Sequence, residues 1–332
     1  MPDNAARIDA GMLVHLSTNL WNDSPVPLVE PYDEEPFFSP RLRFDRDLWV
    51  EMSHRMADAG FTYVLLDLGD AIVYESHPEI AVEGAWSTTE LREELDRLRA
   101  IGLEPLPKLN FSTAHDAWMG PYARRVSTPG YYAFCADLIA EVSELFDRPR
   151  LFHIGMDEET LHVQRTYPYV VLRQHDLWWH DLEFLAEEVR RAGSRAWMWS
   201  DYAWSKPDFF TTASTSIVQS NWHYEMVFSG DEAGRPHVID WPEGALPPTA
   251  FLTYLDLQDG GFDQIPTAST WVDDENFART VEFGRARLRP DAVLGYLQST
   301  WKRMLPEYRD IHERAIASVA ATLAGPESGA RS

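Results

Sequence analysis

The sequence is poor in cysteine, in positive charge and in long apolar runs. Its one cysteine, Cys135, cannot form an internal disulfide, and its helical context YYAFCADLIAEV indicates a core position. Lys and Arg number 29 against 53 Asp and Glu, and the net charge of −24 argues against nucleic acid or an anionic membrane as a partner. There is no apolar run of about 18 residues, and the start MPDNAARIDAG lacks a signal-peptide core. We therefore expect a soluble, cytoplasmic protein.

Aromatic side chains, in contrast, are abundant, with 13 Trp, 13 Tyr and 16 Phe. Such rings stack on the C–H faces of sugars, but the core of a large barrel also uses them. Composition alone leaves both interpretations open. The 332 residues, 45% of them hydrophobic, suffice for a large core.

Short apolar runs alternate with segments of helical period along the whole chain. Strands are expected over 11–17, 61–70, 103–110, 150–155, 194–200, 214–222, 249–256 and 292–300. Helices are expected over 44–60, 88–102, 129–146, 178–193, 273–287 and 306–323. This alternation predicts a single (β/α)8 TIM barrel over residues 1–323, followed by a flexible tail over 324–332.

In such barrels the chemistry takes place at the C-terminal ends of the strands. Polar and aromatic residues occupy these positions throughout: His15, Asp67, Asp70, Lys108, Asn110, Asp157, Glu158, Trp199, Asp201, Trp222, Tyr254, Asp256 and Trp301. We therefore predict a functional site at this rim.

The fourth expected strand ends in LFHIGMDEET, where three acids follow one another. Enzymes use paired carboxylates to cut glycosidic bonds. Adjacent residues on a strand point to opposite faces, so Asp157 and Glu158 can share a site only if the chain turns after Gly155. A carboxyl near a like charge and away from water has a raised pKa, which suits a general acid. The third acid, Glu159, is most simply a charge in the first turn of a helix.

The same segment, HIGMDE at 153–158, resembles the His-x-Gly-Gly-Asp-Glu signature of glycoside hydrolase family 20, the β-N-acetylhexosaminidases. Further stretches resemble this family in the same order along roughly residues 45 to 305: YVLLDLGD, HPEIAVEGAWS, LEPLPKLNFSTAH, the Tyr-Leu-Asp at 254–256, and VLGYLQSTW.

The resemblance implies an exo-acting, retaining glycosidase in which the 2-acetamido group of the substrate acts as nucleophile. Glu158 would be the general acid and then the general base. Asp157 would orient the acetamido group, while Asp70 and His115 would form a relay that tunes Glu158.

The resemblance also implies a sugar pocket. Tyr254 would donate a hydrogen bond to the acetamido carbonyl, and Asp256 would bind a sugar hydroxyl. The remaining substrate-binding candidates at the rim are Trp199, Trp222, Trp271, Trp301, His153, His15 and Asp67. The expected partner is a small saccharide or glycoside, with no cofactor and no metal. The oligomeric state is left open, a homodimer included.

The chain departs from the family pattern at positions of hydroxyl recognition. Met156 replaces the second glycine, His15 stands where the family has an arginine, and Lys302 and Arg303 stand where it has a glutamate. The identity of the sugar is therefore open.

Two other functions stay open. One is a metal-dependent barrel hydrolase with His15, His153 and Asp157 as ligands, although the sequence has no HxH or HExxH pair to support it. The other is a non-catalytic carbohydrate-binding protein on a hydrolase scaffold.

Overall fold

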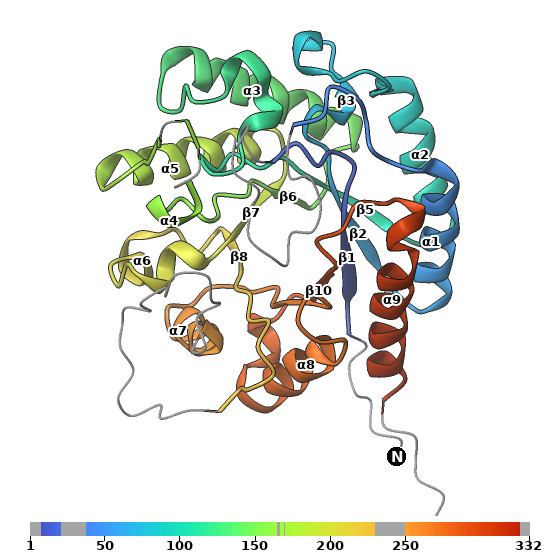
Figure 1. The fold of residues 1–332 in the computed structure, drawn as a ribbon. Coiled ribbons are helices and arrows are strands. Elements are labelled where there is room, and N and C mark those ends of the chain that lie inside the picture. Colours follow the sequence, from blue (N-terminus) through green and yellow to red (C-terminus); the bar gives the residue numbers. More distant parts are fainter. Residues whose placement is uncertain (1–7, 21–37, 165–166, 169, 230–249, 326–332) are drawn as a thin grey trace, which may run out of the picture.

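Eight parallel strands form a nearly closed barrel with helices around it (Figure 1). The computed structural model describes residues 8–20, 38–164, 167–168, 170–229 and 250–325. The strand order is β8-β7-β6-β5-β2-β1-β10-β9, and single bridges from Gln219 to Gln264 and from Trp222 to Thr267 join the two edges. The predicted (β/α)8 barrel is confirmed. The barrel strands are β1 (Ala10–His15), β2 (Tyr63–Asp67), β5 (Glu104–Lys108), β6 (Leu151–His153), β7 (Arg195–Trp199), β8 (Val218–Ser220), β9 (Thr267–Ser269) and β10 (Tyr296–Ser299).

The outer layer contains the helices that the sequence predicts. They are α1 (Arg46–Asp58), α2 (Thr88–Ala100), α3 (Pro129–Leu145), α5 (Asp176–Arg191), α8 (Asn276–Arg287) and α9 (Arg309–Ala324). In α2, Ser87 and Glu90 form a capping box at the start, and Leu91, Leu95 and Leu98 form the buried face.

Shorter elements lie mainly in the connections that follow the strands. They are η1 (Gly69–Ala71), β3 (Ile72–Val73), η2 (Pro78–Ile80), β4 (Trp86–Ser87), η3 (Ala117–Tyr122), α4 (Leu161–Gln164), η4 (Asp201–Trp204), α6 (Phe209–Thr212), η6 (Ala250–Leu252), α7 (Thr253–Asp259), η7 (Pro290–Ala292) and η8 (Pro306–Tyr308). Strands β3 and β4 pair with each other in a separate two-stranded sheet.

One predicted strand is wrong: residues 250–256 belong to η6 and α7, and the seventh barrel strand is β9. The stretch AFLTYLD is a short apolar run, and such a run suits a strand or a buried helix equally well by periodicity. Here Phe251, Tyr254 and Leu255 pack with Phe283 and Leu288 in a separate apolar cluster, which a helical turn allows.

The interior of the barrel is filled below the rim. Tyr63 and Trp197 lie edge to face at 6.4 Å inside it, and Gly11 makes room for Tyr63, because a Cβ there would lie 2.0 Å from the ring. Cys135 is buried in α3, which confirms its predicted core position. Among the described helices, none has the length and apolar content to cross a membrane.

Candidate active site

A strained turn after β6 carries the two adjacent acids. Gly155, Met156 and Glu158 have φ angles of 74°, 73° and 57°. At Gly155 only glycine fits, because a Cβ would lie 2.0 Å from Oδ1 of Asn110. Left-handed backbone at a methionine and a glutamate costs energy and persists only where the surroundings hold it. The turn brings Asp157 and Glu158 to the same histidine, as the sequence argument required.

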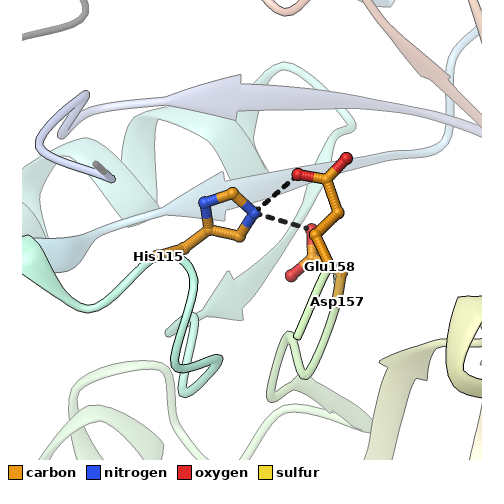
Figure 2. Close-up of side chains that lie close together, drawn as sticks. All are labelled: His115, Asp157 and Glu158. Atoms are coloured by element: carbon orange, nitrogen blue, oxygen red, sulfur yellow. Dashed lines mark hydrogen bonds and ion pairs between the residues drawn. The ribbon is translucent and has the colours of Figure 1, made fainter. Parts of the chain in front are cut away.

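That histidine is His115, from the loop after β5 (Figure 2). Its Nε2 lies 3.0 Å from Oε2 of Glu158 and 3.5 Å from Oδ2 of Asp157. The side chains of His115 and Asp157 are 4% and 10% exposed, whereas that of Glu158 is 26% exposed. Glu158 is thus the acid of this cluster that solvent, and a ligand, can reach most easily.

Two polar residues of the loop after β5 hold Asp157 in place. Nδ2 of Asn110 donates to Oδ1 of Asp157 at 2.9 Å, and the Ser112 hydroxyl donates to the carbonyl of Asp157. Burial opposes the charge on His115, but the negative charge of Asp157 and the hydrogen bond to Glu158 outweigh it and raise the pKa of His115. Asp157 is therefore oriented by an amide on one oxygen and the imidazole on the other.

A third carboxyl, Asp201 in η4, adjoins the turn. Its Oδ2 accepts a hydrogen bond from the backbone N–H of Glu158 at 2.8 Å, and its buried Oδ1 has no partner among the described residues. Burial, followed by the charge of Asp157, raises the pKa of Asp201 well above its usual value. The sequence placed Asp201 at a strand end but did not select it as a site residue.

A second histidine–carboxylate cluster lies at the same rim. Oδ2 of Asp67 is 2.6 Å from Nζ of Lys108 and 2.9 Å from Nδ1 of His15. Burial opposes ionisation of Asp67, but the charge of Lys108 and the hydrogen bond from His15 hold its pKa at about 2. These side chains are engaged with one another, and the predicted contact of His15 and Asp67 with substrate stays a prediction.

Asp70, the expected relay residue, is held by the segment after β1. It accepts hydrogen bonds from the Ser17 hydroxyl at 2.5 Å and from Nδ2 of Asn19 at 2.7 Å. Burial raises its pKa to about 6, despite these hydrogen bonds. Its predicted coupling to His115 stays a prediction.

Several of the predicted aromatic residues gather in one wall. The ring of Trp199 lies 4.5 Å from His153 and 6.0 Å from Trp301. Nε1 of Trp301 donates to the Tyr224 hydroxyl at 3.1 Å, and Tyr224 stacks on Trp222 at 5.2 Å.

Tyr224 is a residue that the sequence analysis missed. Burial is the main reason why the pKa of Tyr224 is raised, and the Tyr254 hydroxyl, followed by the charges of Glu158 and Asp157, raises it further. The available signal was its position just beyond the strand expected over 214–222.

Three further predicted binding residues come from α7 and from the loop after β9. Tyr254 is buried in the apolar cluster of α7, and its hydroxyl has no partner among the described residues. Asp256 is half-buried in the first turn of α7, and Trp271 follows β9, where its backbone N–H donates to Oγ of Ser269. The roles of Tyr254, Asp256 and Trp271 stay predictions.

The cluster of His115, Asp157 and Glu158 has the spacing of metal ligands. The set expected from the sequence was a different one, namely His15, His153 and Asp157. His115, Asp157 and Glu158 each offer an atom within 4.8 Å of the others, which is close enough to hold a cation, and no other such group occurs in the described residues. In the expected set, Nδ1 of His15 is bonded to Asp67, and Nδ1 of His153 accepts from the backbone of Gly155 at 3.0 Å.

The prediction for Glu159 is wrong, because it is not a solvated helix charge. Its side chain is 1% exposed and forms an ion pair with the fully buried Arg173. The sequence could not predict this pairing, since the arginine belongs to a later segment with no regular pattern.

The chain matches no protein-family profile and no curated protein. It does match solved structures. An exo-β-N-acetylglucosaminidase of glycoside hydrolase family 20 from Vibrio harveyi, in complex with N-acetylglucosamine, has 13% identity and a TM-score of 0.61 over 96% of this chain and 55% of that chain. A β-N-acetylhexosaminidase from Bacteroides fragilis has 13% identity and a TM-score of 0.61 over 95% and 65% of the two chains.

An N-acetyl-β-hexosaminidase from Streptomyces plicatus, in complex with Thio-NAglucal, has 15% identity and a TM-score of 0.61 over 96% of this chain and 63% of that chain. This chain therefore spans less than two thirds of the length of each of the three structures. At these identities the likeness shows a shared fold.

Proposed function

We propose that this protein is an exo-acting, retaining glycoside hydrolase that removes a terminal 2-acetamido sugar. One observation carries the proposal: the strained turn brings Glu158, the more exposed acid, and Asp157, the more buried acid, to the same histidine. The sequence resemblance and the fold shared with hexosaminidases support this assignment.

Glu158 begins the reaction as the proton donor. Its carboxyl proton passes to the glycosidic oxygen as the bond from that oxygen to C1 breaks, and the acetamido carbonyl oxygen of the substrate attacks C1. The cyclic oxazolinium-like intermediate carries positive charge, which the neighbouring Asp157 carboxylate stabilises in its desolvated position. Glu158, now ionised, takes a proton from the water that attacks C1 as the bond from C1 to the acetamido oxygen breaks, so the acetamido group is regenerated and the configuration at C1 is retained.

The aromatic wall supplies the sugar pocket. In the proposed complex, Trp199 and Trp301 face the sugar ring and the methyl of its acetamido group. The Tyr224 hydroxyl accepts from Nε1 of Trp301, so its own proton can be donated to the acetamido carbonyl. The resemblance gives this task to Tyr254, but Tyr224 contacts Trp301 of the aromatic wall whereas Tyr254 packs in the apolar cluster of α7, and this difference favours Tyr224.

A panel of aryl β-glycosides with and without the 2-acetamido group tests the proposal. We expect turnover of the 2-acetamido glucosides or galactosides and, at most, traces of activity on the plain glycosides, because only the former contain the nucleophile. Equal rates on both kinds of substrate would exclude the substrate-assisted mechanism.

A second candidate is a metal-dependent hydrolase, since His115, Asp157 and Glu158 could together hold a divalent cation. Oxygen and imidazole ligands suit several such ions. Dialysis against EDTA, followed by readdition of single metal ions, separates the two candidates. Full activity after the chelator supports the glycosidase without metal, and loss with recovery on one ion supports the second candidate.

A further inference from the structure

A buried arginine lies behind the turn that carries Glu158. Arg173 precedes α5, and its side chain is 0% exposed. It donates through Nε and Nη2 to the carboxylate of Glu159, with Nε 3.2 Å from Oε2, and through Nη1 to Asp181 of α5 at 3.1 Å. Burial opposes the charge of Arg173, but the charge of Glu159 outweighs it and raises the pKa of the arginine. Arg173 is therefore a charged group held between two acids.

The same ion pair joins the turn after β6 to the loop after β5. Nη2 of Arg173 donates to the carbonyl of Phe111 at 2.9 Å and lies 3.1 Å from Sδ of Met156. Oε1 of Glu159 accepts from the backbone N–H of Thr113 at 3.0 Å. The contacts of Arg173 and Glu159 thus join the segment that supplies the candidate acid to the segment that supplies its histidine.

Stability alone is a poor explanation for such a pair. A buried ion pair is often no more stabilising than apolar side chains of the same volume, because both charges lose their hydration. The fork of a guanidinium is directional, however, and fixes the carboxylate that it binds. Left-handed backbone at Met156 and Glu158 needs such an external restraint.

We propose that Arg173 and Glu159 are positioning residues, whose ion pair holds the turn so that Glu158 stays within hydrogen-bond distance of His115. The inference rests on the proposed function only in treating Glu158 as the acid. It also gives Met156 a role: where the family pattern has a second glycine, this chain has a side chain whose sulfur contacts the guanidinium.

Glu159→Gln tests the proposal with two 2-acetamido glycosides, one with an aryl leaving group and one with a sugar leaving group. The aryl group leaves readily, so its departure depends less on protonation by Glu158. We expect kcat to fall by about 10²-fold for the sugar leaving group, the size of effect that misplacement of a reacting group produces. The fall for the aryl substrate should be clearly smaller, and KM should change little for either.

The matched control is Glu94→Gln, which removes a partly buried acid paired with Arg97 at 2.6 Å on the outer helix α2. A variant that merely lowers the folded fraction loses the same factor on both substrates. If Glu159→Gln does so too, the proposal is wrong. If Glu159→Gln does not fold, Arg173→Lys is the second variant, because it keeps the buried positive charge but lacks the forked guanidinium. It should also lower kcat more for the sugar leaving group than for the aryl leaving group.

A crystal structure of either variant provides a readout that needs no activity. We expect the distance from Nε2 of His115 to Oε2 of Glu158, 3.0 Å in the native chain, to lengthen beyond hydrogen-bond range. An unchanged contact overturns the inference. If the native protein hydrolyses neither substrate, the proposed function fails, and this distance still decides the positioning role.

Discussion

The rim of the barrel holds two histidine–carboxylate clusters of opposite character. In the open cluster, His115 contacts Asp157 and Glu158, and the side chain of Glu158 is 26% exposed. In the closed cluster, Asp67 contacts Lys108 and His15, and the three side chains are 2%, 1% and 6% exposed.

The two clusters both contain a histidine and a carboxylate, but they differ in the balance of charge. In the closed cluster a lysine neutralises the one carboxylate, and the pKa of Asp67 at about 2 leaves it no proton to donate near neutral pH. In the open cluster two acids share one histidine, and Asp201 adds a third carboxyl nearby. The open cluster thus gathers carboxyl groups around one histidine, and, against the effect of burial, Asp157 and Glu158 raise the pKa of that histidine.

Glu158→Gln removes the acid of the open cluster and should have the largest effect. General acid catalysis contributes about 10²–10⁴-fold, so we expect a loss of this size in kcat on a 2-acetamido disaccharide. The loss should be smaller on an activated aryl glycoside. Steady-state kinetics on both substrates provides the measurement.

The control for this variant is Glu104→Gln at the opposite end of the barrel, where Glu104 pairs with Arg150 at 2.8 Å. It should leave both rates unchanged. Full activity of Glu158→Gln would show that Glu158 is not the general acid. The proposed functional difference between the two clusters would then be wrong as well.

Lys108→Met breaks the closed cluster. The loss of one partner from a buried ion pair costs about 3–5 kcal/mol, measured here as the free energy of unfolding in urea. The folded pKa of Asp67 lies below its unfolded value of about 3.9, so its contribution to stability is present above about pH 4 and is lost as the pH falls towards 2. The difference between native and variant should therefore shrink below about pH 4.

Asp67→Leu combined with Lys108→Met should regain much of the lost stability, because it leaves no unpaired buried charge. A double variant as unstable as Lys108→Met would show that the lysine acts through packing rather than through its charge.

Asp201→Asn probes the third carboxyl of the open cluster. A carboxyl whose pKa is raised in the folded state lowers stability as the pH rises above its unfolded pKa of about 3.9, because the unfolded chain releases the proton first. Asparagine has no such proton. The variant should gain stability relative to the native chain from about pH 4 upward, by at most about 1.4 kcal/mol per pH unit. Urea unfolding across this range measures the gain, and a difference independent of pH would contradict the raised pKa.

The sequence predicted the barrel because strand and helix periods alternate along the chain, and this pattern is local. It also predicted that Asp157 and Glu158 share a site, because a glycine precedes them. The strand over 249–256 was wrong since a short apolar run fits either period. The burial of Glu159 could not be predicted, because it depends on Arg173, a partner that only the tertiary structure brings near.

The smallest expected effect concerns two buried tyrosines that differ in whether the hydroxyl has a hydrogen-bond partner. Tyr224 accepts a hydrogen bond from Trp301 near the acid pair, whereas the Tyr254 hydroxyl has no partner among the described residues. A hydrogen bond between neutral groups contributes about 1 kcal/mol, so Tyr224→Phe should lower kcat/KM on 2-acetamido substrates about fivefold. Tyr254→Phe leaves no partner unpaired and should change kcat/KM little. A larger loss in Tyr254→Phe than in Tyr224→Phe would return the acetamido contact to the tyrosine that the family pattern indicates.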